Sequence, residues 1–211
     1  MVLQLGDPLP DFTCESQVGP INFHSYLGSS WGLIISCPSD HLPVPTTEFG
    51  EASRLSDEFI SRQVKILGIN CSGVDSHQGW IVDVKASTGQ QIDFPILSDA
   101  DRHVTPLLGM TAGNINTVRT CIFVSPSKKV AMSMSYPVTC GMNFHEILRV
   151  VDSLQMTEKN GVSTPVNWVR GQDCMLPELM DDGDADEKFD SVQRIDVPSR
   201  KGYLRIIKDP N

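Results

Sequence analysis

The sequence lacks paired cysteines, because none of its six cysteines belongs to a CxxC motif. The cysteines are far apart in the chain: Cys14, Cys37, Cys71, Cys121, Cys140 and Cys174. Such spacing argues against a disulfide framework and against a zinc site. The histidines also show no ligand spacing with one another. We therefore expect reduced thiols in a cytoplasmic protein, with neither a metal nor a cofactor.

Positive charge and long apolar runs are scarce as well. The chain has 17 Lys and Arg against 26 Asp and Glu, a formal net charge of −9, which argues against nucleic acid or an anionic membrane as a partner. No run approaches the roughly 18 apolar residues that a membrane span requires. The start, MVLQLGDPLPDF, has no basic segment followed by an apolar stretch. We expect neither an integral membrane segment nor a secretory signal.

The 211 residues are 40% hydrophobic and 20% charged, enough for one medium domain and a smaller one. Hydrophobic patterning predicts alternating strands and helices. The expected strands are 12–15, 21–23, 33–36, 64–71, 94–97, 120–124 and 130–134, and the expected helices are 46–62, 76–86, 101–108 and 143–154. This order predicts an α/β fold with a mixed sheet and helices on both faces.

The chain is organised around residues 31–50, which read WGLIISCPSDHLPVPTTEFG. A short apolar strand is followed by a proline-containing turn and then by a segment with helical spacing. The first turn of a helix presents unpaired N–H groups and positive potential, so α/β proteins often carry reactive groups there. The residue at this helix start is Pro45.

The residues from Pro38 to Glu48 carry a resemblance. The order Pro-x-x-x-Thr-Pro-Val-Cys-Thr-Thr-Glu is the active-site signature of peroxiredoxins, and the chain resembles the 1-Cys branch of that family from end to end. Residues 165–168 and 197–205 also resemble its C-terminal domain. The resemblance implies a thioredoxin-like domain over residues 1–160 and a small C-terminal domain over 161–211. It also implies an antioxidant thiol peroxidase of cell redox homeostasis, forming homodimers by strand-edge pairing near residues 130–134.

The resemblance fails at the residues that carry the family's chemistry. Pro38, Glu48 and Arg119 match the family's first proline, helix glutamate and strand arginine. Pro45, however, stands where the family has its peroxidatic cysteine, and Leu42 stands where a threonine orients the peroxide. Met142 replaces a second arginine. No catalytic set is therefore intact.

Proline at position 45 removes both the thiol and a backbone N–H, yet its φ suits the first turn of a helix. We therefore expect the scaffold to persist without the family's reaction. Arg119 has two interpretations: an anchor for an anionic or polar ligand, or a structural ion pair with Glu48.

Two substitute sites would keep the chain an enzyme. Cys37 follows the central strand and could serve as a relocated peroxidatic thiol if its pKa were lowered; otherwise it is an inert buried cysteine. The GxSxG sequence at residues 28–32 resembles the lipase-like motif of 1-Cys peroxiredoxins. Ser30 and His24 match its serine and histidine, but the aspartate position falls at Ser127. A phospholipase A2-like esterase would thus lack its third member.

The sequence leaves a scaffold and an enzyme as alternatives. We favour a binding or scaffold protein derived from a 1-Cys peroxiredoxin. The acidic residues 178–190 are expected to form a solvated loop that could recruit a protein partner.

Overall fold

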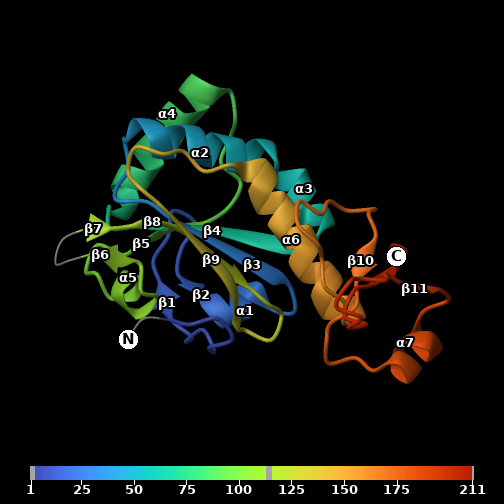
Figure 1. Ribbon diagram of the computed structural model, residues 1–211. Helices are drawn as coiled ribbons and strands as arrows, with labels where there is room; N and C mark the ends of the chain where they lie inside the picture. The colour runs from blue at the N-terminus through green and yellow to red at the C-terminus, as the bar shows by residue number, and fades with distance from the viewer. Residues whose placement is uncertain (1–2, 113–115, 211) are drawn as a thin grey trace. The chain divides into compact units, whose positions relative to one another are not determined.

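The computed structural model describes residues 3–112 and 116–210 (Figure 1). The chain divides into two compact units, Met1–Phe144 and His145–Asn211. The boundary between the two domains expected from the sequence, between residues 160 and 161, stays a prediction.

The first unit contains a five-stranded mixed sheet in the order β5-β4-β3-β8-β9. Its strands are β3 (Trp31–Ser36), β4 (Val64–Asn70), β5 (Ile96–Ser98), β8 (Arg119–Val124) and β9 (Val130–Tyr136). β3 pairs in parallel with β4 and antiparallel with β8. Every residue of β3 is buried, as its apolar sequence predicts for a central strand. The expected mixed sheet and the hairpin β8–β9 are confirmed.

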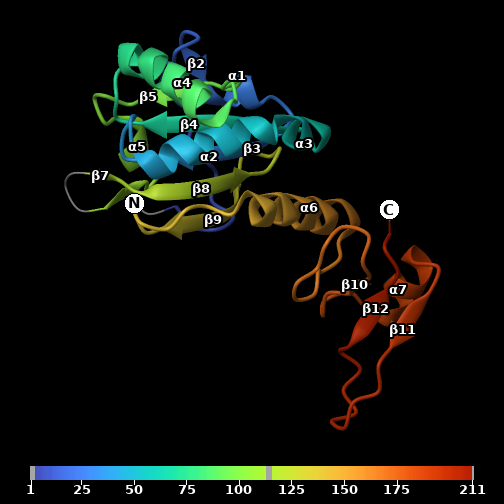
Figure 2. The same cartoon turned by 90° about the horizontal axis from the view of Figure 1, so that it is seen from above.

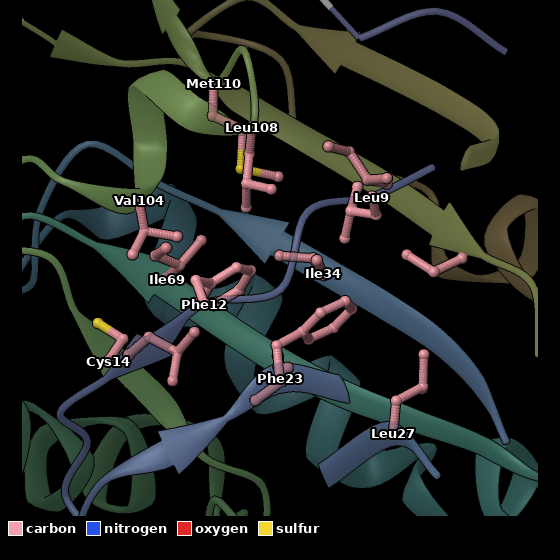
Figure 3. Packing of buried hydrophobic residues seen from close by; sticks show 14 of the residues in the cluster. Leu9, Phe12, Cys14, Phe23, Leu27, Ile34, Ile69, Val104, Leu108 and Met110 are labelled. Carbon is pink, nitrogen blue, oxygen red and sulfur yellow. The ribbon is translucent and has the colours of Figure 1, made fainter. Parts of the chain in front are cut away.

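One face of the sheet is covered by N-terminal segments and by one short helix from the middle of the chain. These are β1 (Thr13–Cys14), β2 (Ile21–Asn22), α1 (Phe23–Leu27) and α5 (Val104–Leu107), seen below the sheet in Figure 1. The rings of Phe12 and Phe23 stack with centroids 5.0 Å apart. They pack with Ile34, Ile69 and Val104 in one apolar cluster (Figure 3). This face has the composition of an ordinary hydrophobic core.

The opposite face carries α2 (Pro43–Arg54) and α4 (Val74–Thr88), which lie above the sheet in Figure 1. Phe49 of α2 lies on Gly68 of β4, where an added Cβ would be 2.5 Å from the Phe49 ring. The same ring contacts Trp80 of α4, with centroids 4.8 Å apart. Glycine at position 68 thus lets α2 approach the sheet closely.

Several element boundaries differ from the sequence predictions. The helix expected over residues 46–62 is two helices, α2 and α3 (Ser56–Ser61), separated at Leu55. The helix expected over 101–108 is only the four-residue α5. A further pair, β6 (Thr111–Ala112) with β7 (Asn116–Thr117), was not expected. Apolar spacing continues through such breaks, so periodicity alone does not reveal them.

The second unit contains most of α6 (Phe144–Asn160) and a small sheet in the order β10-β12-β11. The strands are β10 (Cys174–Met175), β11 (Val192–Arg194) and β12 (Arg205–Ile207), and α7 (Asp182–Lys188) lies with them (Figure 2). Trp168 is fully buried in this unit's core.

Two predictions for this unit were wrong. The acidic segment is not a loop throughout, because α7 forms within it and buries Ala185. Asp181 caps this helix by accepting the Asp184 N–H over 2.8 Å. Strand structure expected over residues 197–205 begins only at Arg205.

Candidate functional site

The start of α2 has few free N–H donors. Pro43 is its first residue and Pro45, which is buried, is its third. Regular helix bonding begins when Thr46 N–H donates to Leu42 O over 3.0 Å. Among the first three helical residues only Val44 therefore has a backbone N–H, because proline has none. This helix start is a poor site for an anion.

The threonines of the same turn are engaged in structure. Thr46 Oγ1 donates to Leu42 O over 2.7 Å and accepts from Trp80 Nε1 over 2.9 Å. Thr47 Oγ1 donates to Val44 O over 2.7 Å. Leu42, the residue before the helix, gives no side-chain cap. The hydroxyls therefore stabilise the turn and its packing on α4.

Arg119 and Glu48 form a buried ion pair between β8 and α2. Their side chains are 1% and 3% exposed, and Arg119 Nη2 donates to Glu48 Oε1. Arg119 Nη1 donates to three carbonyl oxygens of the next loop: those of Pro137 at 2.9 Å, Val138 at 3.2 Å and Cys140 at 2.6 Å. Most donors of this guanidinium are thus used inside the protein.

The ion pair also holds Met142. The Met142 N–H donates to Glu48 Oε1 over 2.8 Å. Burial raises the pKa of Glu48, although the Met142 amide and the Arg119 charge oppose that shift. Glu48 Oε2 and Arg119 Nε are buried without a hydrogen-bond partner. The pair thus fastens the loop after β9 but leaves one donor and one acceptor unused.

Cys37 lies in the interior, just after β3, and is 0% exposed. Burial raises the pKa of its thiol to about 12, and the hydrogen bond from Asn70 offsets this only in part. Asn70 Nδ2 donates to Sγ over 3.4 Å, and the thiol donates to Ser39 O over 3.7 Å. A peroxidatic role would need a lowered pKa of the Cys37 thiol, whereas this environment raises it.

A second buried network, which sequence reasoning missed, holds the loop before α2. The Asp40 carboxylate accepts from His77 Nδ1 over 2.8 Å and from Asn70 Nδ2 over 2.8 Å. Asp40 N–H donates to Ser72 Oγ over 3.1 Å. Burial raises the pKa of Asp40, but the hydrogen bonds to its carboxylate from His77, Ser76 and Asn70 outweigh that effect and the pKa is lowered overall. The available signal was His77 three residues before Trp80, on the buried side of one helix.

The esterase candidates are not assembled into a catalytic pair. His24 Nε2 is 2.9 Å from Leu9 O, and its Nδ1 is 3.9 Å from Asp11 Oδ1. Ser30 lies in the turn before β3, where its N–H donates to Leu27 O over 3.1 Å. No hydrogen bond joins Ser30 to His24 in the part of the chain that the structure describes. Ser127 bonds Ser125, with 2.8 Å between their hydroxyl oxygens.

The described residues offer neither a metal-binding cluster nor a membrane-spanning helix. Residues 3–112 and 116–210 contain no group of three or more His, Cys, Asp or Glu side chains that could hold a metal ion. No helix within those ranges combines the length and apolar composition needed to cross a bilayer.

Comparison with known proteins identifies the chain's relatives. Residues 5–133 match the AhpC/TSA family, and residues 153–191 match the C-terminal domain of 1-Cys peroxiredoxin. The chain is 41% identical to a 1-Cys peroxiredoxin of Dictyostelium discoideum over 99% of this chain and 86% of that protein. It is 40% identical to peroxiredoxin-6 of Rattus norvegicus over 99% and 98% of the two chains.

Solved structures agree with these matches. A cysteine-to-serine mutant of peroxiredoxin 6 from Arenicola marina superposes with a TM-score of 0.93 at 38% identity, covering 99% of each chain. A yeast mitochondrial 1-Cys peroxiredoxin gives 0.91 at 37% identity, covering 98% of this chain and 100% of the other. The expected thioredoxin-like fold with a C-terminal domain is confirmed. The chain therefore belongs to the AhpC/TSA family and, within it, to the 1-Cys peroxiredoxins.

Proposed function

We propose that this 1-Cys peroxiredoxin homologue does not catalyse thiol-dependent peroxide reduction and acts instead as a binding or scaffold protein. The observation that carries the proposal is Pro45 in the first turn of α2. The pattern from Pro38 to Glu48 aligns this residue with the family's peroxidatic cysteine. Peroxide reduction of that type requires a thiolate nucleophile, which proline cannot supply.

The surroundings of Pro45 support the same proposal. A peroxide oxygen would need donors at the helix start, and Pro43 and Pro45 provide no N–H there. Leu42 and Met142 provide neither a hydroxyl nor a guanidinium. Arg119, the remaining cation, donates to three loop carbonyls and to Glu48. We infer that Arg119 has a structural role and is not a ligand anchor.

The runner-up functions are enzymatic. A peroxidase using Cys37 would have to ionise a thiol whose pKa burial raises to about 12. An esterase using Ser30 would need His24 as its base, but His24 Nε2 lies 2.9 Å from Leu9 O, a contact that suits a nitrogen carrying the proton. Both environments weigh against these alternatives.

We also propose that the chain forms homodimers through β9, the edge strand of its sheet. The N-terminal segment pairs with Val130 at the start of this strand. An edge left uncovered beyond that point would present unpaired backbone groups and favour pairing with another strand. Sedimentation velocity at increasing concentration measures the assembly. A chain that stays monomeric at every concentration would exclude this dimer.

We also propose that the acidic residues 178–190 recruit a protein partner, with less negative charge available than the sequence suggests. Arg194 and Arg205 pair with Asp182, and Arg194 also pairs with Asp186, so this charge is partly neutralised within the unit.

We expect a cytoplasmic location, although one relative, PRX1 of Saccharomyces cerevisiae, is named as mitochondrial.

The decisive experiment measures hydrogen peroxide consumption with dithiothreitol for the natural chain and for Cys37→Ser. We expect equal rates at the level of the protein-free background. Turnover that disappears in Cys37→Ser would establish the relocated thiol, and turnover that persists would require another nucleophile. An active 1-Cys relative serves as the assay control.

Two further assays address the remaining alternatives. A fluorophosphonate probe should not label Ser30, with Ser30→Ala as the matched control; labelling that Ser30→Ala abolishes would support an esterase. For the scaffold role, Asp184→Lys with Glu187→Lys reverses two exposed charges of α7. Binding partners captured by the natural chain but lost by this variant would map recruitment to the acidic segment.

A further inference from the structure

Two sulfur atoms are in contact beside the Glu48–Arg119 pair. The Cys121 thiol donates to Met142 Sδ over 3.3 Å. Cys121 lies on β8 and is 0% exposed, whereas Met142 is half-buried in the loop after β9. The contact therefore joins the interior of the sheet to a thioether that reaches the surface.

The surroundings of this thioether contain unused hydrogen-bonding capacity. Arg119 Nη2 and the Met142 N–H both donate to Glu48 Oε1, which brings the guanidinium next to Met142. Arg119 Nε is buried and has no partner. Cys121 is two residues from Arg119 on one strand, so both side chains leave the same face of the sheet. A buried unpaired N–H is costly, so this side of the ion pair has a donor to offer to any acceptor that reaches it.

We propose that Met142 is a site of stoichiometric sulfoxidation by hydroperoxides. A lone pair of the thioether attacks the distal peroxide oxygen, an S–O bond forms and the O–O bond breaks. Sulfur loses two electrons, the peroxide is reduced, and its proton moves to the departing oxygen, which leaves as water or an alcohol. This inference goes beyond the proposed function and does not depend on it, because no thiolate takes part.

Met142 differs from the other methionines that the structure describes. Met110 and Met156 are 0% and 4% exposed, so peroxide has little access to them. Met132 and Met134 on β9, and Met175 and Met180 in the second unit, are half-buried like Met142. Among the half-buried methionines in the described ranges, Met142 alone accepts a hydrogen bond at its sulfur. It combines access with nearby donors.

These donors would assist the reaction. Negative charge develops on the departing oxygen, and a fixed donor close to that oxygen lowers the barrier. Burial raises the pKa of the Cys121 thiol, so it stays protonated and able to donate. The Cys121 thiol, already beside this sulfur, would then donate to the sulfoxide oxygen, which is otherwise difficult to accommodate in a protein interior.

The test treats the folded chain with a small excess of hydrogen peroxide and follows each methionine by peptide mass spectrometry. We expect Met142 to oxidise roughly fivefold or more faster than Met132, Met134, Met175 and Met180. In guanidinium the five rates should become equal, because unfolding removes the local environment. Equal rates in the folded chain, or a slower rate at Met142, would overturn the proposal.

Variants separate the donor from simple exposure. Cys121→Ser retains a hydroxyl donor and should keep the preference for Met142, whereas Cys121→Val should reduce it. Met142→Leu should remove the first one-oxygen adduct from the intact-mass profile, and an unchanged early adduct would contradict the inference. Catalytic peroxide turnover without Met142 oxidation would refute both this inference and the proposed function. Turnover together with preferential Met142 oxidation would refute only the proposed function.

Discussion

The two faces of the five-stranded sheet use different means to hold the same strands. The face covered by α1 and α5 is filled with apolar side chains such as Phe12, Phe23 and Leu27. The face covered by α2 carries charged and polar groups as well, among them Glu48, Arg119 and the Asp40–His77 pair. The polar groups of the second face bond mostly to one another and to nearby backbone.

This difference has an energetic consequence. Apolar burial is spread over many contacts, so losing one side chain leaves a cavity of limited cost. Substituting one partner of a buried ion pair costs more folding free energy, because the other partner is left as an uncompensated buried charge. The polar face should therefore be the more sensitive to single substitutions and the more dependent on pH.

The largest effect is expected for Arg119→Met. This change leaves Glu48 buried without its partner and frees three loop carbonyls, at a cost of about 3–5 kcal/mol in the free energy of unfolding. The double variant with Glu48→Leu should recover much of that loss, because neither charge is then buried. Urea unfolding of the four chains measures the coupling. A loss below about 1 kcal/mol for the single variant would show that the ion pair contributes little to the stability of the fold.

A somewhat smaller effect is expected for Leu27→Ala on the apolar face. The lost burial and the cavity should reduce the free energy of unfolding by about 2–4 kcal/mol. Combined with Arg119→Met, the two losses should add to within about 0.5 kcal/mol, because the sites share no partner. Strong coupling in the urea midpoints would show that the two faces are not energetically independent.

The Asp40 network should make the polar face sensitive to acid. The pKa of Asp40 is lowered in the folded protein, so its contribution is complete above the unfolded value, about 3.9. That contribution is lost as the pH falls through the folded pKa. Asp40→Asn should cost about 1–3 kcal/mol at pH 7.

The pH dependence itself checks this prediction. The difference in unfolding free energy between the natural chain and Asp40→Asn should shrink as the pH approaches 3. Leu27→Ala serves as a control, because its difference should not follow the titration of a carboxyl. A constant gap for Asp40→Asn between pH 3 and 7 would be the contrary result.

The smallest effect is expected at Pro45, the residue on which the proposed function rests. Pro45→Ala should change the free energy of unfolding by less than about 1 kcal/mol, because proline at this first-turn position gives up no helical hydrogen bond. Thermal unfolding followed by circular dichroism is sufficient to measure it. A loss above about 2 kcal/mol would mean that Pro45 contributes packing that alanine cannot replace.

Much of the first unit could be predicted from the sequence. The apolar run before Cys37 predicts the central strand, and Phe49 with Ala52 predicts the helix that follows. The length of α5 and the break at Leu55 could not be predicted from the sequence, because the spacing of apolar residues is the same with or without a local change of φ and ψ. In the second unit the many carboxylates suggested a loop, whereas capping by Asp181 and burial of Ala185 allow a helix.

The candidate site divides in the same way. Pro45 and Leu42 could be identified from the sequence because the linear motif from Pro38 to Glu48 fixes their positions. Met142 lies outside that motif and was matched through the resemblance of the chain as a whole. Only the tertiary structure shows that Arg119 donates hydrogen bonds to a loop and to Glu48. It also shows that Cys37 is too deeply buried to ionise readily and that His77 is hydrogen-bonded to Asp40. Linear order records which groups are present, whereas pKa values and hydrogen-bond partners depend on side chains far apart in the chain and on the exclusion of water around them.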